Sequence, residues 1–222
     1  MKAFLILAHP EPKSFNGAMF RTAAETLRAE GHEVHTSDLH AMQWNPVSDR
    51  RNFVTVKDPD YLKLQVEEAH ATEAGGFAPV IETELEKLED CDLMVWQFPL
   101  WWFGMPAILK GWADRVLAMG RTYGYGKIYD SGAFRGKRAL LSLTTGGPAE
   151  AYTPEGFNGD IMGILRPVHR GVLQFLGFDV LAPQIVYGPV RVDEARRREW
   201  LEAWAGRLRR IGDEAPIQVG RY

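Results

Sequence analysis

Runs of consecutive apolar residues recur along the chain, separated by stretches in which apolar residues return every three or four positions. The runs cover 3–8, 93–98, 139–144 and 180–187, and a shorter, more polar candidate covers 33–37. Continuous apolar runs are typical of strands that are buried on both faces of a parallel sheet. The pattern therefore predicts five strands.

Helical spacing fills most of the intervals between these strands. The predicted helices begin after Ser14, near Ile81, at Pro106, near Asp160 and after Asp193. Pro167 is expected to kink the fourth helix, which extends to about residue 176. Residues 39–77 are polar and irregular and predict no regular element. This alternation predicts an α/β fold, a doubly wound five-stranded parallel sheet with helices on both faces.

Composition narrows the class of protein. The 222 residues predict a single domain over 1–222, in which 26 Lys and Arg stand against 29 Asp and Glu. A net charge of −3 argues against a protein whose main function is to bind nucleic acid. Cys91 has no second cysteine with which to form an intrachain disulfide, and no apolar stretch is long enough for a membrane span. A cytoplasmic protein is expected.

In a doubly wound sheet, ligands bind beyond the carboxyl ends of the strands. That rule selects the loops 9–14, 99–105 and 144–160. The first loop leads into a helix N-terminus, where free N–H groups and the helix dipole attract phosphate. Lys13 and Asn16 could add donors there. The alternative is a capped helix that holds no ligand.

The other two loops point to a flat ligand. Trp101, Trp102 and Phe103 cannot all enter the core, because the backbone is leaving the sheet there. They could wall a planar ligand, form a subunit interface or do both, and the alternative is a purely structural aromatic cluster. Gly146 and Gly147 let backbone amides approach a ligand edge closely, although a plain turn would also use glycines.

Several motifs in and around these loops together indicate a resemblance to one family. They are Leu7-Ala8-His9, Ser14-Phe15-Asn16, Gln97-Phe98-Pro99-Leu100, Trp102-Phe103-Gly104, Pro106-Ala107-Ile108-Leu109-Lys110-Gly111-Trp112, Thr144-Thr145-Gly146-Gly147 and Tyr152. From Leu5 to about Pro216, the sequence resembles the NAD(P)H:quinone oxidoreductases, a flavodoxin-like family that includes the mammalian quinone reductases. The resemblance implies a tightly bound flavin, FAD with FMN as the alternative, and NAD(P)H as hydride donor.

The resemblance also implies which residues surround the cofactor. His9, Ser14, Phe15 and Asn16 would hold its phosphates, and Ala18 belongs to the same set. The residues around the flavin ring would be Pro99, Leu100, Trp102, Phe103, Thr144, Thr145, Gly146, Gly147 and Tyr152. Arg196 matches a cofactor-contacting arginine of the family, and its alternative interpretation is a solvated helix face.

Two departures and one shared feature concern catalysis. The family's catalytic pair is a Tyr and a His six residues later, whereas here Tyr152 is followed by Asn158, which cannot ionise. Asn158 could orient Tyr152 or a water, or could be a plain loop residue. Trp101 stands where the mammalian enzymes have Gln. In the family, the tyrosines that match Tyr123 and Tyr125 cover the partner subunit's flavin, which implies a homodimer with shared active sites.

The implied activity is two-electron reduction of quinones by ping-pong hydride transfer. The alternatives are a flavin-bearing regulatory subunit of a potassium-efflux system, a reductase of azo or nitro compounds, and a one-electron carrier, which the net charge of −3 disfavours. No metal site is expected, because His32 and His35 lack a partner at a usual ligand spacing. No RNA site is expected in the arginine run that begins at Arg196.

Overall fold

The computed structural model describes residues 1–220. Its strands are β1 (Lys2–Leu7), β2 (Glu33–Asp38), β3 (Leu93–Pro99), β4 (Arg138–Thr145), β5 (Asp179–Val180) and β6 (Gln184–Tyr187). Its α-helices are α1 (Phe15–Ala29), α2 (Leu64–Ala74), α3 (Pro79–Asp90), α4 (Ala107–Val116), α5 (Ile161–Val168) and α6 (Glu194–Leu208). A π-helical segment, η4 (His169–Gln174), continues α5.

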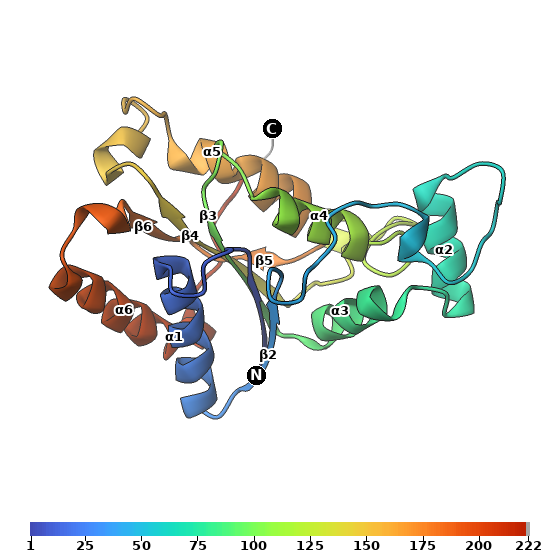
Figure 1. The fold of residues 1–222 in the computed structure, drawn as a ribbon, viewed down its shortest axis with the longest axis horizontal. Coiled ribbons are helices and arrows are strands. Elements are labelled where there is room, and N and C mark those ends of the chain that lie inside the picture. The colour runs from blue at the N-terminus through green and yellow to red at the C-terminus, as the bar shows by residue number, and fades with distance from the viewer. Residues whose placement is uncertain (221–222) are drawn as a thin grey trace.

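The strands form a parallel sheet in the order β2-β1-β3-β4-β5, with β6 also paired to β4. Two layers of helices cover it (Figure 1): α1 and α6 lie on one face, and α3, α4 and α5 lie on the other. This arrangement confirms the doubly wound parallel fold. Within residues 1–220, no helix is both long and apolar enough to cross a membrane.

The fifth strand position differs from the sequence prediction. A single strand over 180–187 was expected, but β5 and β6 are separate strands that pair with successive parts of β4. Val180 lies opposite Ala139, and Ile185 lies opposite Leu143. Pro183 between them has no N–H to donate to a sheet ladder, which explains why pairing breaks there.

The predicted helix starts are nearly correct. The Ser14 hydroxyl accepts a hydrogen bond from Gly17 N at 3.1 Å, and an Asp193 carboxylate oxygen accepts one from Arg196 N at 2.8 Å. Both side chains are therefore N-caps, as expected. Pro106 is itself the N-cap residue of α4 rather than its first helical residue, because its ψ of 146° is extended.

Two segments depart from expectation. The helix predicted over 160–176 changes from α to π geometry two residues after Pro167, which removes one backbone donor from the helical ladder. Residues 39–77, predicted irregular, contain α2. The buried face of α2 includes Glu67 and Glu68 in place of a purely apolar stripe, so its hydrophobic pattern is absent from the sequence.

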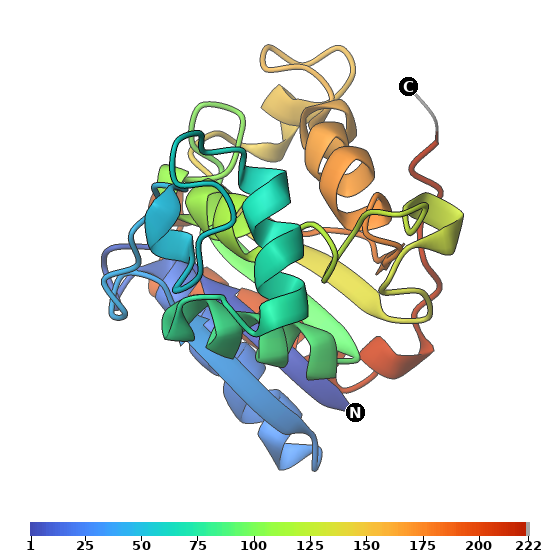
Figure 2. The same cartoon turned by 90° about the vertical axis from the view of Figure 1, so that its right-hand side faces the viewer.

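The chain after α6 runs along the β5 edge of the sheet (Figure 2), where Ile217 N donates to Val180 O at 2.8 Å. Ile217 and Val219 pack against the larger of the two hydrophobic clusters, the one under α3, α4 and α5. The carboxyl ends of the strands are left open by these layers, and the loops that the sequence singled out meet there.

Candidate functional site

The N-terminus of α1 lies beyond the carboxyl end of β1. Ser14 satisfies the amide of Gly17, but the amides of Phe15 and Asn16 have no acceptor within residues 1–220. Together with the dipole of a 15-residue helix, these amides favour an anionic group. His9 lies in the same loop, and burial lowers the pKa of its imidazole, which favours the neutral form.

The side chain of Asn16 is turned into the protein. It is buried, its amide donates to the Thr144 hydroxyl at 2.9 Å, and its carbonyl accepts from the Gln97 amide at 2.8 Å. These hydrogen bonds connect Gln97, Asn16 and Thr144 and thereby join β3, α1 and β4. Asn16 can therefore meet a ligand through its backbone amide, while its side chain fixes the spacing of the three loops.

The aromatic segment forms a tight turn. Trp101 and Gly104 exchange backbone hydrogen bonds at 3.1 and 2.9 Å, and between them Trp102 and Phe103 have positive φ angles of 51° and 58°. Two positive φ angles define a type I′ turn, in which bulky residues are strained. Trp102 is 99% exposed and Phe103 53% exposed, so neither ring contributes to the core. Strain held at exposed rings is typical of a binding site.

In the loop after β4, three successive backbone carbonyls accept hydrogen bonds from donors that lie on the protein side of the loop. Gly188 N donates to Thr145 O at 2.9 Å, Arg191 Nε donates to Gly146 O at 2.9 Å, and the Thr145 hydroxyl donates to Gly147 O at 2.8 Å. In a trans peptide, the N–H points opposite to the C=O of the same unit. The amides of Gly146 and Gly147 therefore point away from these donors, and within residues 1–220 neither has an acceptor.

Tyr152 and Asn158 converge on Gly147. A Cβ at Gly147 would lie 3.2 Å from Tyr152 Cε2, 3.7 Å from the Tyr152 hydroxyl and 3.6 Å from Asn158 Nδ2. The Tyr152 ring is mostly buried and packs at 5.8 Å from the ring of Tyr187. The two residues that the resemblance singled out thus share one neighbour, and glycine leaves room for both.

A cavity of about 450 Å³ lies between the N-termini of α1 and α6. It is lined by Lys13, Ser14, Phe15, Ala18, Pro189, Val190, Glu194, Arg197, Arg198 and Leu201. Arg196 is outside this lining: its guanidinium pairs with Glu199 at 2.7 Å and lies over the Trp200 ring. Its neighbour Arg197 faces the cavity and donates to Val192 O at 2.7 Å.

Tyr123 and Tyr125 lie in the loop after α4. Because α4 runs back from the carboxyl end of β3, this loop lies near the amino ends of the strands, away from Gly147. The Tyr123 hydroxyl accepts from Gln65 Nε2 at 3.2 Å, and its ring packs at 5.7 Å from that of Phe175. Tyr125 is 74% exposed. Both are remote from the site of their own chain, as the sequence geometry predicts.

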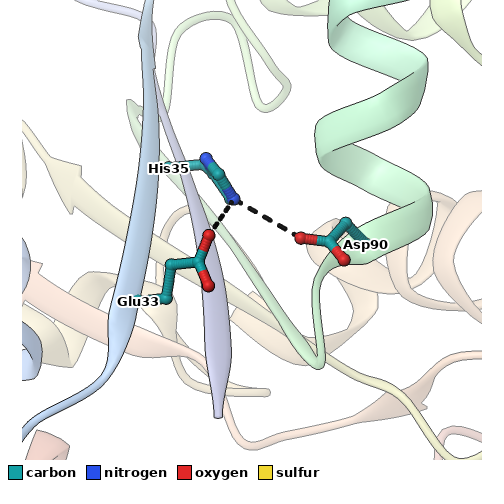
Figure 3. A group of neighbouring side chains, drawn as sticks. All are labelled: Glu33, His35 and Asp90. Atoms are coloured by element: carbon teal, nitrogen blue, oxygen red, sulfur yellow. Dashed lines mark ion pairs between the residues drawn. The ribbon is translucent and has the colours of Figure 1, made fainter.

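His35 belongs to a cluster of charged side chains away from this site (Figure 3). His35 Nε2 lies 3.2 Å from a Glu33 oxygen and 3.5 Å from an Asp90 oxygen, and Lys2 Nζ contacts the other Asp90 oxygen at 2.6 Å. The cluster lies at the amino ends of β1 and β2. Lys2 is the first cause of the lowered pKa of Asp90, so the cluster is explained as a set of surface ion pairs.

Sequence reasoning missed two arginines near the site, Arg191 and Arg197. Arg191 is the last residue of a 3₁₀ turn, η5 (Pro189–Arg191), that begins after the left-handed Gly188. Its acceptor, Gly146, is 45 residues away in the sequence. The Gly188-Pro189 pair is a turn signal that could have located the bend, but the contact itself depends on the tertiary fold.

Comparison with known proteins agrees with this geometry. The family described as having a flavodoxin-like fold matches residues 1–208. NAD(P)H dehydrogenase [quinone] 1 of Cavia porcellus is 45% identical over 217 residues, which cover 97% of this chain and 79% of that protein. Human ribosyldihydronicotinamide dehydrogenase [quinone] is 44% identical over 97% of this chain and 94% of that protein.

A solved structure gives the same result. A protein from Klebsiella pneumoniae assigned as a quinone reductase superposes with a TM-score of 0.93 at 41% identity, covering 98% of this chain and 87% of that one. The chain therefore belongs to the flavodoxin-like family and, within it, to the quinone dehydrogenases that the sequence motifs indicated.

Proposed function

We propose that this protein is a flavin-dependent NAD(P)H:quinone oxidoreductase. The observation that carries the proposal is the loop after β4. Three of its backbone carbonyls accept hydrogen bonds from the protein side, and the amides of Gly146 and Gly147 have no acceptor within residues 1–220. The exposed rings of Trp102 and Phe103 lie on the adjacent loop. Relatives named as quinone dehydrogenases, at 43–45% identity, support the substrate class.

The residues present fit a flavin. Its flat ring has apolar faces and one polar edge, which match an aromatic wall beside a pair of amides, and its phosphate matches the amides of Phe15 and Asn16. When bound, the flavin supplies hydride transfer: it accepts hydride from NAD(P)H and delivers it to a quinone, which we propose follows in ping-pong order.

The chain's own groups would favour the reduced, more negative ring. Gly146 and Gly147 provide donors whose orientation is fixed before the ligand arrives, which is the arrangement that stabilises developing charge. Tyr152 would add a neutral hydroxyl donor. Asn158 would hold that hydroxyl or a water in place, because an amide can donate and accept but cannot take up a proton. Trp102 and Phe103 would exclude water from the ring face.

We further propose that the cofactor is FAD. The cavity between the N-termini of α1 and α6 is lined by Ser14 and Phe15 of the proposed phosphate site and continues to Arg197 and Leu201 of α6. A ligand that fills both regions must continue past a single phosphate, as FAD does and FMN does not. Arg197 is placed to contact that second half, in the role that the resemblance suggested for Arg196.

The active enzyme is proposed to be a homodimer with two composite sites. Tyr123 lines an apolar groove of about 360 Å³ together with Val172 and Phe175, and Tyr125, two residues later, is exposed. Neither tyrosine lines the cavity at α1 and α6 or is among the nearest neighbours of Gly147 in its own chain. A two-fold partner would bring these rings over the other chain's flavin, as the resemblance implies.

Three measurements test the proposal. The purified protein should be yellow and should release FAD on denaturation, and it should oxidise NAD(P)H rapidly only when a quinone is added. Sedimentation should give twice the chain mass. Colourless protein that takes up no flavin would refute the cofactor. Yellow protein that turns over no quinone would favour the regulatory role instead, and an active monomer would refute the shared site.

A further inference from the structure

Arg191 contacts the backbone at the polar edge of the site. Its Nε donates to Gly146 O at 2.9 Å, and its side chain folds back over Gly188, where a Cβ would lie 3.1 Å from Arg191 Cδ. The backbone of Arg191 is fixed as well, since Arg191 N donates to Gly188 O at 2.8 Å. Arg197 in turn donates to Pro189 O and Val192 O, which brace the same turn. The guanidinium is thus held at Gly146 by a braced loop.

The charge of this guanidinium is not neutralised by a neighbour. Within residues 1–220, no carboxylate forms an ion pair with Arg191, whereas Arg196 pairs with Glu199 and Arg198 pairs with Glu194. An arginine keeps its charge throughout the working pH range. Arg191 therefore places a permanent positive charge on the loop that presents the two free amides.

The contact also sets the direction of one of those amides. Gly146 O and Gly147 N–H belong to the same trans peptide, so that a donor on the carbonyl fixes the N–H to point the opposite way. A charged donor on the carbonyl also polarises the peptide and strengthens its N–H as a donor. Gly146 and Gly147 flank this peptide, and glycine backbone tolerates either direction of the unit, so the contact from Arg191 selects one of them.

We propose that Arg191 is a positioning residue that locks the 146–147 peptide toward the flavin and makes the site bind reduced flavin in preference to oxidised flavin. This inference rests on the proposed function. It answers the question raised by Asn158, because a fixed cation behind the amide can balance the charge of the reduced ring although Asn158 cannot take up a proton. Hydride adds a proton and two electrons to the ring, so its anionic reduced form gains one negative charge, which Arg191 opposes without itself exchanging a proton.

The test compares four full-length proteins loaded with FAD: the parent, Arg191→Gln, Arg191→Lys and Arg209→Gln. The control Arg209→Gln removes one positive charge at the C-terminal end of α6, where Arg209 is exposed and 3.6 Å from Glu30. The dissociation constant of oxidised FAD is measured by fluorescence titration, and the two-electron midpoint potential by equilibration with a reference dye. Neither readout depends on turnover.

We expect Arg191→Gln to lower the ratio of reduced to oxidised FAD affinity about tenfold, equal to a potential about 30 mV lower for a two-electron couple. Arg191→Lys keeps the charge and should shift the potential by less than half as much as Arg191→Gln, and Arg209→Gln should match the parent. Equal shifts for Gln and Lys, or no shift for Gln, would overturn the inference while leaving flavin binding intact. Parent protein that binds no flavin would overturn the proposed function as well.

Since the side chain of Arg191 is exposed, its replacement leaves no buried gap. Should Arg191→Gln nevertheless lose flavin, recovery of binding and of the parent potential in Arg191→Lys would support the role of the charge. Loss of flavin in both variants, with parent-like unfolding curves, would show that the charge alone does not account for Arg191 and would overturn the proposed preference for reduced flavin.

Discussion

Gln97 on β3 donates its side-chain amide to the carbonyl oxygen of Asn16 in the first turn of α1, at 2.8 Å and with both side chains buried. Asn16 passes the connection on to Thr144 at 2.9 Å. The loops that carry the proposed phosphate-binding amides, the aromatic turn and the glycines are therefore tied together beneath the site. Asn16 can serve both partners because its side-chain amide accepts from one and donates to the other.

Replacing Asn16 with Ala should lower the free energy of unfolding by about 2 to 3 kcal/mol, because buried polar groups on Gln97 and Thr144 would lose their partner. Urea unfolding checks this value. Ser14→Ala removes only the helix cap two residues earlier and should cost about 1 kcal/mol. Equal losses in the two variants would show that the buried connection adds nothing beyond local helix stability.

At the proposed active site, Tyr152→Phe should slow the reduction of bound flavin by NAD(P)H by as much as about 10²-fold. Asn158→Ala should have a smaller effect. Asn158→His should introduce a pH dependence between about 6 and 7 that the parent lacks, because histidine ionises in that range. Stopped-flow reduction across pH measures all three. An inflection already present in the parent would mean that another group takes up the charge.

A different histidine should control stability at acid pH. His169 is buried, its Nε2 has no hydrogen-bond partner within residues 1–220, and desolvation lowers its pKa from 6.5 to about 4. Between these two values the unfolded chain binds a proton that the folded chain does not. Stability should therefore fall as the pH drops from about 6.5 to 4, with this group contributing about 3 kcal/mol to the loss.

His169→Leu should remove this contribution, so that the difference in unfolding free energy between variant and parent shifts in favour of the variant as the pH falls. Denaturant unfolding at pH 7, 5.5 and 4 measures it. Parallel pH profiles for the two proteins would show that His169 does not titrate in this way.

Cys91 should be inert toward thiol reagents in the folded protein. Its side chain is fully buried, and burial raises the pKa of the thiol to about 12, so the reactive thiolate is almost absent at neutral pH. Modification should become fast only in denaturant. Ala74→Cys, at an exposed position in the last turn of α2, provides a thiol that should react at once in the folded state. Comparable rates for the two thiols in native buffer would contradict this expectation.

The parts of the fold that local sequence determines were predictable. Ser14 and Asp193 cap helices by accepting from backbone amides three residues away, and continuous apolar runs mark β1, β3 and β4. Helix α2 was not predictable in this way. Glu67 is buried there because it accepts hydrogen bonds from Lys57 N and Asp58 N, partners that only the folded chain supplies.

The same distinction holds at the candidate site. The glycines and the aromatic segment could be identified from residue type and from their place after a strand. The choice between Arg196 and Arg197 could not be made from the sequence. The two residues are adjacent, and only the packing of α6 decides which one faces the cavity. Arg191 reaches its acceptor 45 residues away, a contact with no local signature.

The turn at Trp102 and Phe103 has a consequence for how this protein can change over time. Left-handed backbone favours Asn or Gly, so replacing either aromatic residue with one of these would make the ligand-free chain more stable while removing the wall of the site. Selection for a robust fold and selection for cofactor retention therefore act in opposite directions at these two positions. Keeping both rings there is a compromise that only a bound ligand can make advantageous.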